Sequence, residues 1–213
     1  STCLVYLEDI IVYGRTFDEH QERLQEVFNR LHAAGLKLKP SKCHLFCSQV
    51  AFLGHLVAAD GVSADPDKIA AVKDWPCPTT ASAVRAFLGF CNYYRRFVCD
   101  FAHRASPLYE LTRKNSPFVW TTECQAAFED LRAALTTSPV LAFPQFGLSS
   151  APFVLDVDAS GSGLGAVLSQ CQGGEERVIA YASRLLQDAE LRYPVTKREL
   201  LAAVWAMRHF RCY

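Results

Sequence analysis

The chain has 213 residues, with 22 Lys and Arg against 22 Asp and Glu, so its formal net charge is zero. Half of the residues are hydrophobic, which favours a packed core and excludes wholesale disorder. A free-standing nucleic-acid binder is usually basic, so the overall charge counts slightly against one. The nine cysteines are scattered without a C-x-x-C pair, which indicates reduced thiols of an intracellular protein. No apolar run approaches the roughly 20 residues of a membrane span.

The first part of the chain alternates strand and helix patterns. Two apolar runs over residues 3–13 surround Glu8 and Asp9 and predict a β-hairpin with the acids at its tip. Apolar side chains at three- and four-residue steps predict a helix over 17–34. Two strand-like runs follow, over 36–46 and 50–62, and the second ends in an Asp-Gly turn signal.

From residue 65 to 138 the pattern becomes mostly helical. Capping residues and an N-terminal proline predict three helix starts: Asp65-Pro66, Thr80 or Ser82, and Thr122. The first helix is expected to place Trp75 on its apolar face, and the second to extend its apolar face to Phe97. Three prolines and a Gly-Leu-Ser-Ser stretch make 139–152 the linker candidate.

After the linker candidate the hydrophobic period changes from helix to strand. Three antiparallel strands are predicted, over 153–158, 164–170 and 177–183. Two glycines at 173–174 mark a hairpin turn between the second and third strands. A helix is predicted over 196–211. We expect an α+β protein, with a mostly helical stretch over 65–138 between two regions that contain strands.

Two acidic groups are candidate metal ligands. Glu8 and Asp9 suit a divalent cation, because Mg²⁺ prefers carboxylate oxygens, although a polar turn explains them as well. The second group is Asp158 on a predicted strand and Glu199 in the first turns of the last helix; Asp156 shares the strand face of Asp158 and is assigned no role. For Asp158 the simpler reading is a strand-end acid that caps the Ser-Gly turn, and for Glu199 an exposed helix acid.

Two further clusters leave alternatives open. Tyr93, Arg95 and Arg96 combine positive charge with aromatic surface, which suits contact with phosphates and bases, but helix packing with a solvated arginine edge explains them equally. The Cys43, His44 and Cys47 cluster could be half of a zinc site, but no second pair at ligand spacing follows it closely, which favours buried thiols.

The ordered motifs resemble a known family. C-L-V-Y-L-E-D-I-I-V-Y is similar to the Y-x-D-D hairpin of the reverse transcriptases of gypsy-type long-terminal-repeat retroelements. Further segments resemble later parts of the same polyprotein in the same order: the next palm motif (35–43), the primer grip (52–55), the thumb (75–97), and the connection (118–132 and 138–146). V-D-A-S (157–160) and R-E-L-L-A (198–202) resemble the first two acidic motifs of its ribonuclease H domain.

The resemblance implies a domain plan. Residues 1–64 would be the C-terminal part of the palm, and 65–138 the helical thumb and connection. After the 139–152 linker, residues 153–213 would be the first half of a ribonuclease H-like α/β domain with a truncated mixed sheet. The sequence starts without Met and stops directly after a helix, so we expect a fragment. Because each site would lack carboxylates that the family requires, we expect the fragment to be inactive alone.

The resemblance also implies site residues and ligands. Asp9 matches the second aspartate of the polymerase motif, Glu8 stands in place of the first, and Asp158 and Glu199 match nuclease acids; all four would hold Mg²⁺ or Mn²⁺. Lys42 would approach the nucleotide phosphates, unless it is a solvated surface lysine. The implied nucleic-acid contacts are Phe52, Leu53, Gly54, His55, Tyr93, Arg95 and Arg96. The ligands would be an RNA template, a DNA primer, dNTP and an RNA–DNA hybrid.

Two functions remain in competition, with a third reading behind them. The first is a catalytic part of a reverse transcriptase–ribonuclease H, acting with the rest of the Pol polyprotein in a cytoplasmic particle or the nucleus, without a membrane. The second is a non-catalytic, retroelement-derived remnant that binds nucleic acid or a protein, which Glu8 favours. An unrelated α/β binding module would require every ordered motif to be a coincidence.

Overall fold

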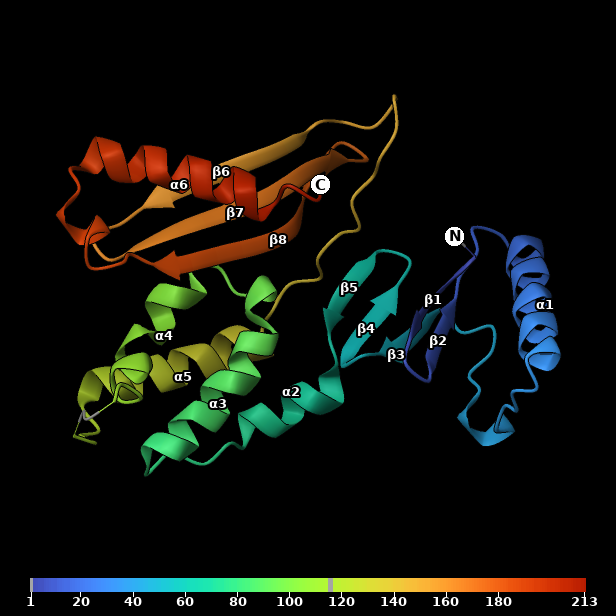
Figure 1. Ribbon diagram of the computed structural model, residues 1–213, viewed down its shortest axis with the longest axis horizontal. Coiled ribbons are helices and arrows are strands. Elements are labelled where there is room, and N and C mark those ends of the chain that lie inside the picture. The colour runs from blue at the N-terminus through green and yellow to red at the C-terminus, as the bar shows by residue number, and fades with distance from the viewer. Residues whose placement is uncertain (1, 115–116) are drawn as a thin grey trace. The chain divides into compact units, whose positions relative to one another are not determined.

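The computed structural model describes residues 2–114 and 117–213 (Figure 1). It divides after Leu53 into two compact units, each of which is described by itself. Both units mix helices with small antiparallel sheets, as expected for an α+β chain. Within the described ranges, no helix is both long enough and apolar enough to span a lipid bilayer.

The first unit begins with the predicted acidic hairpin. Strands β1 (Cys3–Tyr6) and β2 (Asp9–Val12) pair antiparallel with Tyr6 opposite Asp9, so Leu7 and Glu8 form a two-residue loop. Leu7 takes a positive φ of 52°, which costs a non-glycine residue about 1 kcal/mol. Helix α1 (Phe17–Ala33) follows the hairpin, and its N-cap Thr16 accepts a hydrogen bond from the Glu19 N–H. The hairpin and helix predictions are thereby confirmed.

Two strand predictions are wrong in the region that follows. Residues 36–46 form no strand and contain only the 3₁₀ turn η1 (Pro40–Lys42), because Pro40 has no N–H to donate to a sheet. Residues 50–62 do not form one run. They are divided among β3 (Gln49–Phe52), β4 (His55–Ala58) and β5 (Gly61–Ala64).

These divisions have a backbone cause. Leu53 and Gly54 both take positive φ angles, of 48° and 68°, so no strand continues through them. In the second unit, β4 and β5 pair antiparallel with Ala58 opposite Gly61, and the Asp60-Gly61 turn is confirmed.

The second unit contains the predicted helices and one that was missed. Helices α2 (Pro66–Lys73), α3 (Ala81–Tyr93) and α5 (Thr122–Thr136) begin where expected, with Asp65, Thr80 and Thr121 as side-chain caps. Trp75 lies beyond α2 rather than on it. The 3₁₀ turn η2 (Arg95–Phe97) and helix α4 (Phe101–Glu110) were not predicted, because Pro107 inside α4 is a residue that normally argues against a helix. Together these helices enclose the main hydrophobic core.

A three-stranded sheet forms the rest of the second unit. Strands β6 (Phe153–Ala159), β7 (Gly163–Gln172) and β8 (Glu175–Leu185) pair antiparallel in chain order, with a tight turn at Gly173-Gly174. After a 3₁₀ turn, η3 (Glu190–Arg192), helix α6 (Val195–His209) covers one sheet face (Figure 1). On β8, Val178 and Tyr181 pack against the helical core instead. The sheet therefore lies between α6 and the helices α3 to α5.

The connector between the helices and the sheet is held at several points. Leu141 forms an antiparallel bridge with Val62, with both N–H···O distances at 2.8 Å. The Ala142 N–H donates to the Val178 carbonyl at 2.8 Å. The amide of the fully buried Gln170 donates to the carbonyls of Gln145 and Ala151 and accepts from the Gln145 N–H. The predicted linker is therefore held in place along much of its length, while the boundaries of the four predicted segments stay predictions.

Gly61 should be intolerant of a side chain. A Cβ atom at Gly61 would lie well inside contact distance of the Leu141 carbonyl, and its φ of +150° is strained for alanine. We expect Gly61→Ala to lower the free energy of unfolding by about 3 kcal/mol in urea titrations, because it forces the Val62–Leu141 bridge apart. Gly173→Ala is the matched control, since its φ is +64° but its Cβ meets nothing within 4 Å. Equal losses for both variants would contradict the prediction.

Candidate functional site

The acidic hairpin presents two adjacent carboxylates to solvent. Glu8 is the second loop residue and Asp9 the first residue of β2, and both are exposed. Their apolar neighbours Tyr6 and Leu7 are also exposed, at 56% and 79%. Among the described residues, no group of three or more His, Cys, Asp and Glu side chains gathers to hold a metal ion. The donors are of the chemical kind that a hard divalent cation prefers, but two carboxylates are not a complete set of ligands.

The residues predicted for the primer end fall in both units. Phe52 and Leu53 end the first unit, which also carries the exposed Lys42 on η1. Gly54 and His55 open the second unit, where the Tyr94 hydroxyl donates to the Gly54 carbonyl at 2.7 Å. A Cβ atom on Gly54 would lie 3.1 Å from that hydroxyl, and the φ of +68° is strained for a residue with a side chain, so both favour glycine here.

An aromatic cluster surrounds His55 in the second unit. The His55 ring centroid lies 5.3 Å from that of Tyr93 and 5.6 Å from those of Tyr94 and Phe97. Tyr94 and Phe97 are buried, whereas Tyr93 is 54% exposed. The structure thus brings together three of the predicted nucleic-acid residues, namely Gly54, His55 and Tyr93, with a ring face open to solvent.

The two predicted phosphate-binding arginines are directed at the sheet. The Arg95 guanidinium donates to the Ser183 carbonyl and to Asn92, and lies 5.6 Å from the Phe101 ring. Arg96 donates to the Ile179 carbonyl at 3.4 Å. Both side chains are only partly exposed. A phosphate would therefore have to compete with these carbonyls, and phosphate contact by either arginine stays a prediction.

The second acidic group lies on the sheet and on α6. Asp156 and Asp158 are exposed on the face of β6 that points away from α6, since the alternate residues Leu155 and Val157 pack toward that helix. Glu199 is exposed near the start of α6. The adjacent Arg198 donates to the Ser160 carbonyl at 2.9 Å, which holds the start of α6 at the end of β6 that carries Asp158.

Asp100, which lies near the cross-strand partner of Asp158, was not found as a site residue from the sequence. Asp158 is paired directly with Gly165 on β7, and a Cβ atom at Gly165 would lie 3.3 Å from Asp100 Oδ1. Directly opposed residues point to the same sheet face, so Asp100 lies on the Asp158 side. Asp100 precedes α4 with a φ of 58°, a conformation in which Asp is enriched. Sequence could have suggested the turn, but not its position beside Asp158.

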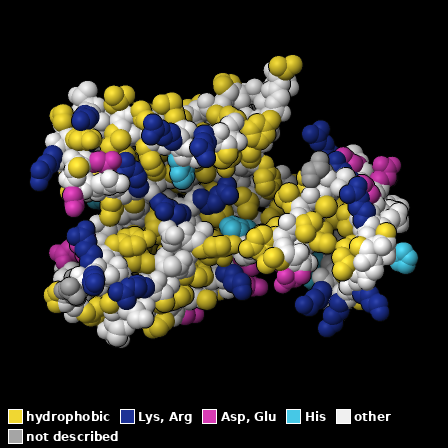
Figure 2. All heavy atoms as spheres, viewed as in Figure 1, with side chains coloured by type: hydrophobic (Ala, Val, Ile, Leu, Met, Phe, Trp, Pro, Cys, Tyr) yellow, Lys and Arg dark blue, Asp and Glu magenta, His cyan; other side chains and the backbone are white. Residues whose placement is uncertain are grey.

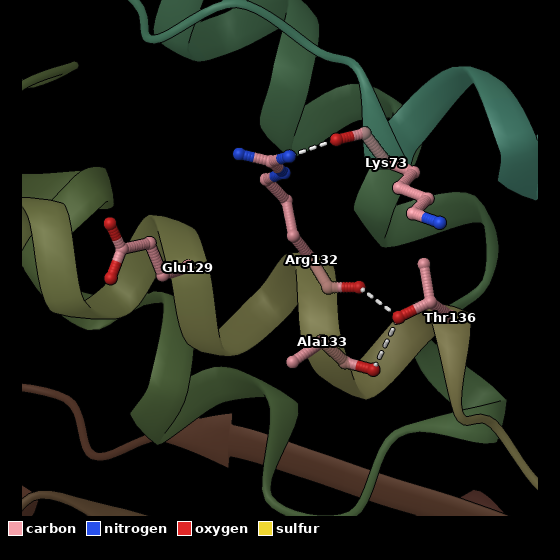
Figure 3. A pocket seen from close by; sticks show the side chains of 5 residues that line it. All are labelled: Lys73, Glu129, Arg132, Ala133 and Thr136. Atoms are coloured by element: carbon pink, nitrogen blue, oxygen red, sulfur yellow. Dashed lines mark hydrogen bonds between the residues drawn. The ribbon is translucent and has the colours of Figure 1, made fainter.

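Two surface pockets lie in the second unit. One of about 220 Å³ lies between α2 and α5, where Arg132 donates to the Lys73 carbonyl at the end of α2 (Figure 3). Glu129, Ala133 and Thr136 complete its lining, and none of the predicted site residues takes part. Arg132 thus donates from α5 to a carbonyl at the C-terminal end of α2, a place that suits a cation.

The second pocket, of about 430 Å³, lies between α4 and β8. Its lining includes Arg95, Arg113 and Arg184, together with Phe101 and Glu110. Arg184 forms a bidentate ion pair with Glu190, and this hydrogen bonding lowers the pKa of the Glu190 carboxyl. On the face shown in Figure 2, Lys and Arg side chains lie between the sheet and the helices below it. The seam between the two is therefore basic although the whole chain is neutral.

Two family sequence models match the chain. The family described as "Reverse transcriptase (RNA-dependent DNA polymerase)" matches residues 1–57, which include the acidic hairpin. The family described as "RNase H-like domain found in reverse transcriptase" matches residues 120–213, which include Asp158 and Glu199.

Curated relatives and solved structures agree with these matches. The retrovirus-related Pol polyproteins from the Drosophila melanogaster transposons opus, 412 and gypsy are 40%, 39% and 36% identical over 96–100% of this chain. The chain spans 22%, 17% and 20% of their respective lengths. A foamy viral protease-reverse transcriptase in complex with RNA/DNA hybrid superposes with a TM-score of 0.82 at 27% identity, over 97% of this chain and 28% of that one. The foamy viral protein designated dRH, in complex with double-stranded DNA, gives 0.85 at 27% identity, over 97% and 36%.

The buried Tyr94 hydroxyl should make stability fall at alkaline pH. Burial, followed by the nearby Tyr93 and Asp65, raises the pKa of Tyr94 to about 12. An unfolded tyrosine loses its proton near pH 10, so between about pH 10 and 12 the unfolded state binds fewer protons and stability drops. We expect Tyr94→Phe to reduce this drop, and to cost about 1 kcal/mol at pH 8 because Gly54 loses its donor. Urea titrations from pH 8 to 11 measure both effects.

The control for this experiment is Tyr6→Phe, which changes an exposed tyrosine of the acidic hairpin. It should leave the alkaline loss of stability unchanged. An identical pH dependence for Tyr94→Phe and the original chain would contradict the expected role of Tyr94.

Proposed function

Because the chain belongs to the reverse transcriptase and ribonuclease H-like region of the retrovirus-related Pol polyproteins of transposons, we propose that it serves in copying retroelement RNA into DNA and in hydrolysing the RNA of RNA–DNA hybrids. One observation carries the proposal. Both acidic groups that match family motifs are exposed: Glu8 and Asp9 at a hairpin turn, Asp158 on the face of β6 that points away from α6, and Glu199 near the start of α6, where a nucleic acid has access.

In the proposed polymerase role, Glu8 and Asp9 hold a divalent cation. Reverse transcriptases and ribonucleases H use divalent metals as families, and Mg²⁺ or Mn²⁺ suits these carboxylates. Glu8 is one methylene longer than the aspartate of the family motif, which displaces its oxygens from the position that the aspartate would give them. Phe52, Leu53, Gly54 and His55 would hold the primer end, and Lys42 would approach the phosphates of the incoming dNTP.

In the proposed nuclease role, Asp158 and Glu199 hold the divalent cation. The hybrid would be recognised through its backbone and 2′-hydroxyls rather than through its base sequence. Tyr93 would stack on a sugar or base, and Arg95 and Arg96 would contact phosphates. The foamy viral protein solved with an RNA/DNA hybrid supports the same class of ligand for this chain. The remaining parts of a Pol polyprotein are the proposed partners, in an intracellular particle or the nucleus.

A non-catalytic remnant is the second candidate function. Glu8 favours it, because a displaced carboxylate at the polymerase centre weakens the chemistry while leaving binding surfaces intact. The unaltered V-D-A-S and R-E-L-L-A motifs favour the enzyme. The two candidates share nucleic-acid binding and differ in whether bonds are made or cut.

Shortening Glu8 should increase polymerisation. The transposon 412 Pol polyprotein is made with this chain in place of its own matching segment. Extension of a labelled primer on an RNA template is then measured. We expect Glu8→Asp to raise the rate by up to about 100-fold, because an ångström of misplacement costs about that much. Glu8→Gln, which keeps the length and removes the charge, should lower it. Equal rates for Glu8→Asp and the parent would show that this position does not limit the reaction.

Asp158 should be required for hybrid cleavage. In the same exchanged polyprotein, we expect Asp158→Asn to reduce cleavage of labelled RNA in an RNA–DNA hybrid by at least about 100-fold, because the variant loses a carboxylate that holds the cation. Asp156→Asn is the matched control on the same strand face and should stay within a few-fold of the parent. If the parent binds the hybrid but never cuts it, the remnant function is correct instead.

A further inference from the structure

The outer edge of β8 is covered by its own chain. An open sheet edge leaves backbone donors and acceptors without partners. In addition to the bonds with β7, three β8 carbonyls accept hydrogen bonds from other parts of the chain. The Val178 carbonyl accepts from the Ala142 N–H, that of Ile179 from Arg96, and that of Ser183 from Arg95. Both guanidiniums come from η2, at the entrance to α4.

Ser183 joins the sheet to α4 by a second bond. Its side chain is 2% exposed, and its Oγ accepts a hydrogen bond from the Ala102 N–H at 2.8 Å. The first N–H groups of a helix need acceptors from outside the helix, and the N-cap residue usually supplies one. Here the N-cap Asp100 makes no such side-chain bond. Ser183 of β8 therefore caps α4 in its place.

The capped start of α4 lies over a row of directly paired residues that crosses the three strands and contains Asp158. Asp158, Gly165 and Ser183 are consecutive cross-strand partners on β6, β7 and β8. Gly165 has no side chain, which leaves room for the Asp100 carboxylate between the other two residues. A movement of α4 relative to the sheet would therefore change the surroundings of Asp158 directly.

We propose that Ser183 and Arg95 are positioning residues that fix the start of α4 on the Asp158 row, so that the thumb helices and the nuclease-like face move together. Arg95 holds the Ser183 backbone while Ser183 holds the α4 backbone, and each contact orients the other. The importance of Asp158 rests on the proposed function, but the coupling between α4 and the row does not.

Amide hydrogen exchange measured by NMR on the 213-residue chain, without nucleic acid or metal, tests the coupling. We expect Ser183→Ala and Arg95→Ala to speed exchange at Ala102 and at Gly165 and Asp158 by at least about 10-fold. Arg95→Lys keeps one donor and should give intermediate rates. Buried α5 amides, such as Leu131 and Leu135, should be unaffected.

The matched control is Arg177→Ala. Arg177 is also on β8 and also donates to a backbone carbonyl, that of Asp60 at 3.0 Å, but it lies outside the Asp158 row. This variant should leave exchange at Ala102 and Gly165 unchanged. The proposal is overturned if amide exchange in the Ser183 and Arg95 variants speeds up at Ala102 but not at Gly165 and Asp158. It is also overturned if exchange in α5 speeds up equally. A failure of the proposed function would appear instead as lost hybrid cleavage with the exchange pattern intact.

Discussion

Backbone polar groups at the edge of β8 have to be paired, and the way they are paired organises the whole second unit. The strand is bonded to β7 on one side, while the connector, η2 and α4 supply donors to it from elsewhere in the unit. A buried carbonyl without a donor costs about 1–3 kcal/mol, so three such contacts are a substantial part of a marginal folding free energy. Because these contacts join helices to sheet, stability and the placement of the helices on the sheet depend on the same bonds.

Many of the hydrogen bonds between different parts of the chain are donated by arginine side chains. Arg95, Arg96, Arg132 and Arg198 each donate to a backbone carbonyl outside their own helix or turn. A guanidinium has five donors on a planar group, so it can satisfy a carbonyl and still contact an aromatic ring, as Arg132 does over Phe128. Positive charge near a predicted nucleic-acid surface is therefore ambiguous in sequence, since the same residue type serves packing and phosphate contact.

Local chemistry explains which parts of the fold could be predicted from sequence. The caps Thr16, Asp65, Thr80 and Thr121 act within three residues, so helix starts could be placed without tertiary information. The failures depend on longer contacts or on conflicting local signals. Residues 36–46 have alternating apolar side chains but also Pro40, and α4 contains Pro107 and is capped by Ser183, 81 residues away.

The candidate site shows the same limit. Asp158 and Glu199 could be selected from motifs, and the hairpin of Glu8 and Asp9 from its flanking strands. The proximity of Asp100 to Asp158 could not, because it requires the register of β6 with β7 and the absence of a side chain at Gly165.

The connector tip is anchored at both ends and free in between. Gln170 holds the backbone at Gln145 and Ala151, while Leu148 is fully exposed and the tip projects away from the sheet (Figure 1). Lengthening a loop whose ends are already fixed changes its closure entropy only slowly, by about 0.6 kcal/mol for each doubling. The tip is thus a permissive position in the chain, where extra residues or a fluorescent label can be inserted without reaching either the core or the row of Asp158, Gly165 and Ser183.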